Sequence, residues 1–435
     1  MSPGDLAALV CCDLGAIVRG RSVLAEQLPE TLAGGVGWVP ANSALTPLGP
    51  LAEPNPFGST GDLRLLPDSD THVRADAAAG VFELVLCDIV EIDGAPWSCC
   101  PRTFLREALA ELEQELGARV LASFEHEFQL PEESPSALPF SLEAQRRVEP
   151  FPSLVMLALS EAGVGPERIF AEFASHQFEI PLAPAEGLAS ADHAVVLREL
   201  VREVARGLGS RATFTPLLDP SEAGNGVHIH LSLLDERGSP LFYDPAQPAA
   251  LSELGQRFAA GVLRHARALT ALCAPSPVSG ERLKPHHWSA GAVSLSPQNR
   301  EALLRIPPLS TLGGQEPAAQ LRLEYRGADA SANPYLALGA ILRAGLAGVR
   351  EQLPAPAMLT QDPATLAPEQ AERHGVGALP VDLADALDAL AADERVRGWL
   401  SPLMYEAYVS LKQAELAAVA GLQLADRCRR YAAVY

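Results

Sequence analysis

The sequence has no long apolar run and few basic residues. No stretch approaches the roughly 20 consecutive apolar residues of a membrane-spanning helix, and no early stretch combines a basic flank, an apolar run and a cleavage site. Lys and Arg number 33 against 54 Asp and Glu, which gives a net charge of −21. This charge argues against nucleic acid or an anionic membrane as the main partner. We therefore expect a cytoplasmic protein with neither partner.

Cysteine is also scarce, with seven residues, and none falls in a spacing expected for zinc. Cys11-Cys12 and Cys99-Cys100 are neighbours in sequence, and the odd total fits a reduced compartment. We interpret the cysteines as small, buried, apolar residues.

What the sequence does have is a long chain, 435 residues with 48% hydrophobic content, which can bury a sizeable core and suggests two or more domains. Residues 1–100 are typical of a small β-rich unit, with short apolar runs at Ala7–Asp13, Ala16–Val18 and Phe82–Ile89 and a long Pro/Gly-rich loop at Ala44–Gly61. A boundary near Pro101 precedes a larger unit that mixes strands and helices, so the expected class is α+β.

Helical patterns follow in the larger unit. They cover Phe104–Leu116, Pro152–Ala162, Ser190–Gly207 (with Asp192 and His193 in its first turn), Ala249–Cys273, Asn333–Gln352, Val381–Ala392 and Pro402–Leu422. The segment Pro275–Arg305 is expected to be irregular, and Pro354–Gly377 to be a loop.

The strand pattern Phe124–Leu130 places Glu125, Glu127 and Gln129 on one face, and the apolar side chains with His126 on the other. Carboxylates two residues apart on a strand lie about 6.5 to 7 Å from each other. That spacing is too long to share a proton and suits two different cations. The alternative is a solvated strand face.

Three later segments repeat this design. Val227–Leu231 places His228 and His230 on one face, and Leu321–Arg326 does the same for Arg322, Glu324 and Arg326. In the fourth segment, Glu172 and Glu179 are an odd number of positions apart, so they converge only if the chain turns near Ser175-His176.

The order of these motifs resembles that of the glutamine synthetase family, and the match covers most of the chain. The motifs are Phe124–Phe128, Glu172–Ile180, Gly224–His230, Asn299–Pro307 and Arg322–Tyr335, with Asp13–Gly15, Val18–Gly20 and Leu65–Asp68 nearer the start. The resemblance implies a β-grasp domain over residues 1–100. It also implies a catalytic domain over residues 101–435, whose antiparallel sheet forms an active-site funnel. The family assembles into rings, here expected to be dodecamers, with each site between neighbouring subunits.

The same resemblance implies ATP and two or three divalent cations per site. By position in the motifs, Glu127, Glu172 and Glu179 would hold one cation and Glu125, His228 and Glu324 the second. Oxygen-rich ligation with one imidazole and no thiolate suits Mg²⁺ or Mn²⁺ better than zinc. The cations would clamp the ATP phosphates while the γ-carboxylate of glutamate attacks in line, giving an acyl phosphate for attack by an amine.

Arginines complete the implied site, because guanidinium groups suit carboxylate and phosphoryl oxygens. The resemblance assigns glutamate binding to Arg282, Arg326 and Gly224, and nucleotide contacts to His230, Ser232, Arg300, Arg305 and Arg322. Arg282, Arg300, Arg326 and Trp288 form the expected catalytic set. For His230, a purely structural role stays open.

Two departures from the family concern ammonium. Glutamine synthetases use an aspartate in an N-terminal Asp-Gly-Ser-Ser motif and a glutamate six positions after the arginine matched by Arg282. Here the sixth position is Trp288, and Asn55–Thr60 holds no aspartate. An aromatic wall accepts an alkyl or aryl amine better than a small hydrated NH₄⁺. This resembles the γ-glutamyl-amine ligase branch, which acts on polyamines, ethanolamine, methylamine and anilines. Two alternatives are that Trp288 packs away from the pocket, or that Asp62 or Asp68 replaces the missing aspartate.

Other departures are Ala223, where many relatives have asparagine, and His176, where glycine is usual. No tyrosine lies between Pro354 and Arg397, so control by adenylylation of a loop tyrosine is not expected. The sequence therefore predicts an ATP-dependent ligase that forms a γ-glutamyl amide from glutamate and an organic amine. One alternative is a true glutamine synthetase that uses ammonia. The other is a catalytically silent regulatory homologue, but the complete set of six metal ligands argues against this second alternative.

Overall fold

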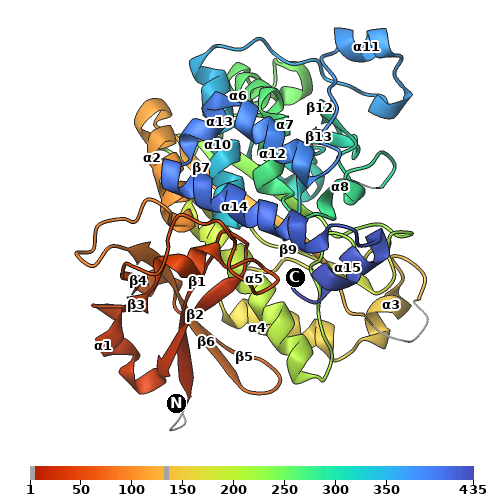
Figure 1. The fold of residues 1–435 in the computed structure, drawn as a ribbon. Coiled ribbons are helices and arrows are strands. Elements are labelled where there is room, and N and C mark those ends of the chain that lie inside the picture. Colours follow the sequence, from red (N-terminus) through yellow and green to blue (C-terminus); the bar gives the residue numbers. More distant parts are fainter. Residues whose placement is uncertain (1–4, 132–136, 288) are drawn as a thin grey trace.

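Two β-sheets organise the chain in the computed structural model, which describes residues 5–131, 137–287 and 289–435 (Figure 1). The first sheet has the order β2-β1-β6-β4-β3, and β5 also pairs with β6. Its strands are β1 (Leu6–Cys12), β2 (Val18–Leu24), β3 (Val36–Trp38), β4 (Leu63–Pro67), β5 (Val73–Asp76) and β6 (Val81–Val90).

The second sheet has the order β12-β13-β14-β11-β7-β9-β8, with β10 also paired to β7. Its strands are β7 (Arg119–Gln129), β8 (Phe170–Ala171), β9 (Gln177–Pro181), β10 (Ala185–Glu186), β11 (Val227–Leu234), β12 (Ala292–Pro297), β13 (Ala302–Ile306) and β14 (Leu323–Ala328). Neighbouring strands are antiparallel except β12 and β13, which are parallel. With the helices, this confirms the α+β class.

Most helices belong to the unit of the second sheet, whereas α1 lies beside the first sheet (Figure 1). They are α1 (Leu28–Leu32), α2 (Pro101–Leu116), α3 (Leu142–Arg147), α4 (Phe151–Glu161), α5 (Leu188–Gly207), α6 (Glu253–Arg264), α7 (Ala266–Cys273), α8 (Ser279–Arg282), α9 (Pro317–Gln320), α10 (Pro334–Arg350), α11 (Pro368–Arg373), α12 (Leu383–Ala392), α13 (Glu394–Trp399), α14 (Pro402–Val419) and α15 (Leu424–Ala432). None of these helices is long and apolar enough to cross a membrane. Cytoplasmic localisation stays a prediction.

Helix α10 is the central helix, because every residue from Pro334 to Gly348 is buried. A helix that is buried all round needs apolar or small residues on every face, and its Ala/Leu/Gly-rich sequence supplies them. Asn333 caps it by accepting hydrogen bonds from the Tyr335 and Leu336 amides. The Asn333 amide also donates to the Cys12 and Asp13 carbonyls at 3.1 and 2.9 Å, so the cap ties α10 to the end of β1.

A buried ion-pair network also joins strands of the first sheet to helices α2 and α5. Arg102 in α2 donates to Asp192 at 2.9 Å, to Asp68 at 2.7 Å and to Asp88 at 3.2 Å. Tyr335 donates to the same Asp192 carboxylate at 2.6 Å. A guanidinium and three carboxylates can be buried together only if every one of these groups is hydrogen-bonded. The network therefore fixes β4 and β6 against α2 and α5.

The expected strand, the long loop and most helices are confirmed with end shifts of up to three residues. All seven cysteines are buried and free, as expected. The first unit differs in detail, because Ala16 and Ile17 lie in the turn before β2 and only Val18 belongs to the strand. β2 is an edge strand with mostly exposed residues, so it carries no apolar run. Asp192 is the fifth residue of α5, not part of its first turn.

Three predictions in the second unit are wrong. The helix expected over Ala249–Cys273 is two helices, α6 and α7, which break at His265. There, the imidazole Nδ1 lies 2.6 Å from Asp393, a contact between distant segments that no local pattern reveals. The segment Pro275–Arg305 contains α8, β12 and most of β13, and the two strands pair with each other, so the segment is not irregular throughout. The segment Pro354–Gly377, expected to be a loop, contains the short helix α11. The helices that were also not predicted are α3, α8, α9, α13 and α15 in this unit and α1 in the first. The domain boundary at residue 100 stays a prediction.

Candidate active site

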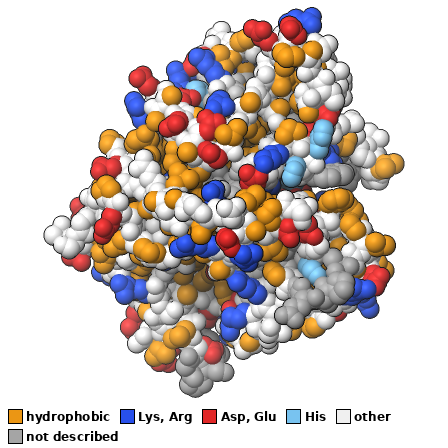
Figure 2. All heavy atoms as spheres, turned by 45° about the vertical axis from the view of Figure 1, so that its right-hand side comes forward, with side chains coloured by type: hydrophobic (Ala, Val, Ile, Leu, Met, Phe, Trp, Pro, Cys, Tyr) orange, Lys and Arg blue, Asp and Glu red, His pale blue; other side chains and the backbone are white. Residues whose placement is uncertain are grey.

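The charged faces of the second sheet meet in one cavity of about 460 Å³. Its lining holds eleven of the predicted site residues: Glu125, Glu127, Glu172, Glu179, His228, His230, Arg300, Arg305, Arg322, Glu324 and Arg326. In the space-filling view, Lys and Arg, Asp and Glu, and His side chains gather around a hollow on the right (Figure 2). Segments up to 200 residues apart thus deliver their polar faces to one place.

Strand register explains this convergence. Across β11 and β7, His228 stands opposite Glu125, and across β7 and β9, Glu127 stands opposite Glu179. On the other side of β11, His230 stands opposite Glu324. Opposite residues on one sheet face have Cβ atoms about 5 Å apart, so each pairing brings two functional groups within ligand distance of a shared ion.

The segment Glu172–Glu179 turns as predicted. β8 and β9 form a hairpin in which Phe170 pairs with Glu179, and the Glu172 amide donates to the Gln177 carbonyl at 2.8 Å. His176 has a φ of 53°, the left-handed conformation that the turn requires. A glycine adopts this conformation without strain, which explains why glycine suits this position. The turn brings Glu172 to the same cavity as Glu179.

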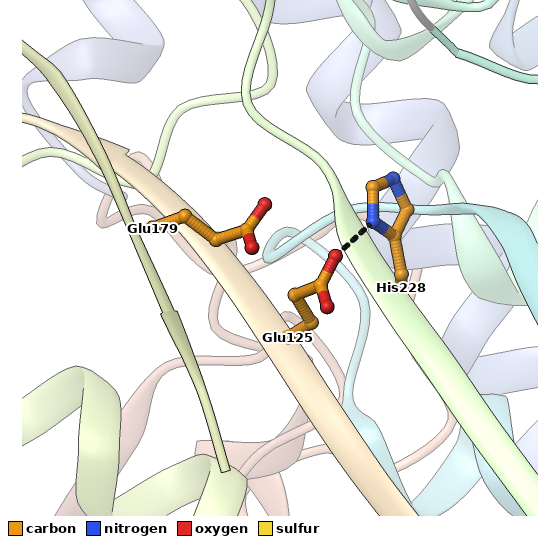
Figure 3. Close-up of side chains that lie close together, drawn as sticks. All are labelled: Glu125, Glu179 and His228. Atoms are coloured by element: carbon orange, nitrogen blue, oxygen red, sulfur yellow. Dashed lines mark hydrogen bonds and ion pairs between the residues drawn. The ribbon is translucent and has the colours of Figure 1, made fainter. Parts of the chain in front are cut away.

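The ligand atoms of Glu125, Glu179 and His228 lie within 4.8 Å of one another (Figure 3). Glu125 Oε1 is 2.8 Å from His228 Nδ1, while Glu127 Oε1 is 4.0 Å from His228 Nε2. This group takes two residues from one predicted ligand triad and one from the other. The division of the six residues between two cations therefore stays a prediction.

The carboxylates near β9 have less positive charge around them than negative charge, although Arg168 and Arg300 lie near them. Burial and the neighbouring Glu125, Glu127 and Glu172 carboxylates raise the pKa of Glu179 to about 11. Burial and Glu127 raise the pKa of Glu172 to about 7. Carboxylates crowded in this way repel one another unless a proton or a cation lies between them. The donor set, rich in carboxylate oxygen with one imidazole, fits a hard divalent cation.

Glu324, on the β14 side, has the opposite environment. Its carboxylate pairs with Arg305 at 2.6 Å and also with Arg326, whose Nε donates to the Arg300 carbonyl at 2.8 Å. Burial alone would raise the pKa of Glu324, but Arg326, His228, His230 and Arg305 lower it to about 2. This part of the cavity thus supplies its own positive charge.

A second cavity of about 220 Å³ adjoins the first, since Glu125, Arg168, His230 and Arg322 line both. Ser232 from β11 lines the second cavity, and its hydroxyl is buried with no hydrogen-bond partner among the described residues. Arg322 Nε donates to His230 Nδ1 at 3.1 Å. The residues predicted to contact nucleotide therefore divide between the two cavities, with His230 and Arg322 at their junction.

Arg282 lies beneath the charged cluster and is absent from the described lining of both cavities. It is buried, its Nη2 donates to the Ala328 carbonyl at 2.7 Å, and its Nε has no described partner. Burial lowers its pKa, although Asp329 and Glu127 oppose this. It packs against Gly224, where an added Cβ would come within 2.2 Å of the Pro216 carbonyl oxygen, so only glycine fits there.

Three further predictions concern the residues expected around the incoming amine. Trp288 lies outside the described residues. Asp68 is bonded to Arg102 in the network between the sheets, so it does not serve as a free carboxylate. Asp62 is exposed and absent from the described lining of the main cavity.

Sequence reasoning missed Arg168 and Phe170, which also line the main cavity. The signal was present, because Arg168, Phe170 and Glu172 alternate and so share a face of an extended segment. The prediction for this segment considered its carboxylates and left out Arg168 and Phe170. Arg168 faces the carboxylates closely enough to lower the pKa of Glu179, against the larger opposing effects of burial and the neighbouring glutamates.

Comparison with known proteins gives matches over the whole chain. Residues 98–431 match the family model of the glutamine synthetase catalytic domain, and residues 1–97 match that of the glutamine synthetase N-terminal domain. The chain is 34% identical over 424 residues to a gamma-glutamylpolyamine synthetase of Streptomyces coelicolor, covering 95% of this chain and 90% of that protein. It is 31% identical over 342 residues to a glutamine synthetase of Methanocaldococcus jannaschii, covering 76% and 74%.

Solved structures agree. A structure described as a novel glutamine synthase homolog has a TM-score of 0.92 at 46% identity and covers 100% of this chain and 99% of that chain. A structure described as a GmaS/ADP complex has a TM-score of 0.83 at 26% identity and covers 96% and 94%.

Proposed function

Because the chain belongs to the glutamine synthetase family and is an ATP-dependent carboxylate–amine ligase, we propose that it joins the γ-carboxylate of glutamate to an organic amine. The reaction would pass through γ-glutamyl phosphate. The similarity to a gamma-glutamylpolyamine synthetase over 95% of the chain carries this choice of nucleophile. Two sequence features support it: tryptophan at position 288, and no aspartate in residues 55–60.

The carboxylates around β9 are proposed to hold the divalent cations, Mg²⁺ or Mn²⁺. Glu127, Glu172 and Glu179 would bind one ion, and Glu125, His228 and Glu324 another. Bound there, the ions would neutralise the ATP phosphates and orient the terminal phosphoryl group. The raised pKa values of Glu172 and Glu179 support this assignment, since uncompensated carboxylates attract cations.

The arginines are proposed to bind the anions that the reaction handles. Arg300, Arg305 and Arg326 line the main cavity, where planar guanidinium groups suit phosphoryl and carboxylate oxygens. His230, Ser232 and Arg322 would contact the nucleotide in the adjoining cavity. The Ser232 hydroxyl has no hydrogen-bond partner in the described part of the chain, which supports a ligand there, since a buried hydroxyl without a hydrogen bond is unfavourable. Arg282 would act from beneath the cluster on the glutamate carboxylate.

Release of ADP tests the proposal. The purified protein with Mg²⁺, ATP and glutamate is assayed against ammonium and a panel of mono-, di- and aromatic amines, and products are identified by mass. We expect kcat/KM for the best organic amine to exceed that for ammonium at least tenfold. A preference for ammonium would favour a true glutamine synthetase, to which this chain also shows similarity. No ADP release with any nucleophile would favour a silent homologue.

Trp288→Glu is a second arm that tests the sequence argument alone. Loss of an aromatic contact worth about 1 to 3 kcal/mol should weaken use of the best amine about 5- to 150-fold, while KM for ATP stays unchanged. Equal discrimination between amine and ammonium in both proteins would remove the support that position 288 gives to the proposal.

We also propose that the protein forms a closed ring, a dodecamer by the family resemblance. Sedimentation or light scattering of the active protein measures this directly. An active monomer would contradict the proposal.

A further inference from the structure

The segment that follows Arg282 returns to β12 through residues 283–287 and 289–291. Its start lies at the metal-ligand cluster: a Cβ placed on Gly226 would lie 3.0 Å from Arg282 Nη1, 3.4 Å from His228 Nε2 and 3.5 Å from Glu127 Oε2. The Ser289 hydroxyl donates to the Arg282 carbonyl at 2.5 Å, so the segment folds back on this arginine. We name residues 283–287 and 289–291 the Arg282 loop.

Glu301 holds the Arg282 loop at two points. Its Oε2 accepts a hydrogen bond from the His286 amide at 3.0 Å, and its backbone carbonyl accepts one from the Gly291 amide at 3.1 Å. At Gly291 a Cβ would lie 3.1 Å from Glu301 Oε2 and from Pro285 Cα, so the approach is close. His286 has a φ of 65°, a conformation that is unfavourable for a non-glycine residue and persists only when neighbouring residues hold it.

Glu301 is itself fixed by its surroundings. Its amide donates to Asn299 Oδ1 at 3.0 Å, and Asn299 Nδ2 donates to the Gln361 carbonyl at 3.1 Å. The residue after Gln361 is Asp362, whose Oδ2 lies 3.0 Å from His286 Nε2. The segments around residues 299 and 361 thus hold Glu301 and contact the Arg282 loop at His286.

Glu301 is also one residue from the cavity wall. Arg300 lines the cavity, and its carbonyl accepts from Arg326 Nε at 2.8 Å. The Glu301 side chain is absent from the described lining of that cavity and faces a separate pocket with Pro285 and Asp362. Among the described residues, the Glu301 side chain therefore reaches the reacting groups through the loop, and its substitution leaves the backbone link to Arg300 in place.

We infer that Glu301 is a positioning residue that fixes the Arg282 loop against the Arg300–Arg326 wall and thereby sets the site into which the amine enters. This inference rests on the proposed function, since it takes the loop to border the amine. Glu301 touches neither the carboxylate cluster nor the nucleotide cavity among the described residues. Its effect should therefore fall on the amine step and leave phosphoryl transfer unchanged.

The test compares Glu301→Ala and Glu301→Asp, which cannot reach His286, with Glu301→Gln, which keeps an acceptor oxygen. Losing a hydrogen bond to a charged acceptor should raise KM for the best amine about tenfold in the first two variants. Glu301→Gln should restore most of the difference, and KM for ATP and glutamate should change less than about twofold in all three. Equal amine KM in wild type, Glu301→Ala and Glu301→Asp would overturn the inference.

Glu281→Ala is the matched control. Glu281 pairs with Lys284 at the start of the same loop, but both side chains are partly exposed, and surface pairs of this kind contribute little. Amine KM should stay at the wild-type value in this variant. If amine KM rose as much in this variant as in Glu301→Ala, any carboxylate that contacts the loop would affect amine KM. That result would overturn the specific role of Glu301.

Amide hydrogen exchange separates this inference from the proposed function. The His286 and Gly291 amides should exchange faster in Glu301→Ala or Glu301→Asp than in wild type, with helix α10 as the internal reference. Wild-type protein that shows no amine-stimulated ADP release refutes the proposed function, whatever the exchange data show. Unchanged exchange in folded variants refutes the inference, whatever amine the enzyme uses.

Discussion

The two faces of the central strands β7, β11 and β14 differ in almost every respect. One face buries Phe124, Phe128, Val227, Ile229, Leu231, Leu323 and Tyr325, each at most 3% exposed. The other carries the carboxylates, imidazoles and guanidinium groups of the cavity. Because side chains alternate along a strand, the same backbone holds both faces. The apolar face provides the stability that lets the charged face hold like charges at short distance.

The charged face itself is uneven. Glu324 has a lowered pKa among arginines, and Glu179 has a raised pKa among carboxylates. The protein therefore supplies positive charge near β14 and leaves it to be supplied near β9. This difference supports the proposed cation site beside Glu179 and Glu172. Substitutions on the charged face should lower activity, and substitutions on the apolar face should lower the free energy of unfolding.

The largest expected effect is on the charged face. Glu179→Ala should lower kcat for ADP release by about 10³-fold or more at saturating Mg²⁺, because losing a metal clamp removes several kcal/mol of transition-state stabilisation. Without Mg²⁺, the melting temperature should stay the same or rise, since the change removes a carboxylate from a repulsive cluster. Glu186→Ala, an exposed acid on β10, serves as control. Near wild-type turnover in Glu179→Ala would end the metal assignment.

The next effect is on the apolar face. Phe128 is fully buried, and its ring lies 5.4 to 6.2 Å from those of Phe151, Phe178 and Phe214. Phe128→Ala should reduce the free energy of unfolding by about 3 to 5 kcal/mol. KM for ATP, measured well below the melting temperature, should not change. Chemical denaturation measures the loss, with Leu157→Ala, a residue 56% exposed, as control. A change in ATP affinity without lost stability would mean that the two faces are not independent.

The sequence could predict this two-faced design because alternation is local. Phe124–Leu130, Val227–Leu231 and Leu321–Arg326 each show their faces within a few residues, and the register of antiparallel neighbours then brings the polar faces together. What depends on distant segments was not predictable. At the break between α6 and α7, His265 contacts Asp393 from a distant segment. Strand β13 pairs with β14, which lies further along the chain. Asp68 is not a free carboxylate because it pairs with Arg102.

A smaller effect concerns His126, the one polar side chain in the apolar face of the Phe124–Leu130 pattern. Burial, with Arg198 and Arg202 nearby, lowers its pKa well below the usual value of about 6.5. The folded protein therefore leaves His126 neutral where the unfolded chain would bind a proton. Stability that is present above pH 6.5 is lost as the pH falls below it, by about 2 kcal/mol at pH 5.

His126→Leu should remove that part of the acid sensitivity. Between pH 7 and pH 5, the free energy of unfolding of the variant should fall about 2 kcal/mol less than that of wild type. Urea denaturation at several pH values provides the measurement. His374→Leu, at an exposed histidine, should follow the wild-type curve. Parallel curves for His126→Leu and wild type would show that His126 does not resist protonation in the fold.

The smallest effect is at the hairpin that carries Glu172 to the charged face. His176 has a φ of 53°, and its carbonyl accepts from the Leu130 amide at 3.0 Å, a backbone contact that any residue can make. His176→Gly relieves the left-handed strain but adds freedom to the unfolded chain. The two effects oppose each other, so we expect a gain in stability between zero and about 1 kcal/mol, with kcat unchanged. Ala174→Gly, in the same turn but without a positive φ, should instead lose about 0.5 to 1 kcal/mol. Urea denaturation of both variants decides the matter: a loss above 1 kcal/mol in His176→Gly would mean that the imidazole, rather than the backbone, holds the turn and with it the position of Glu172.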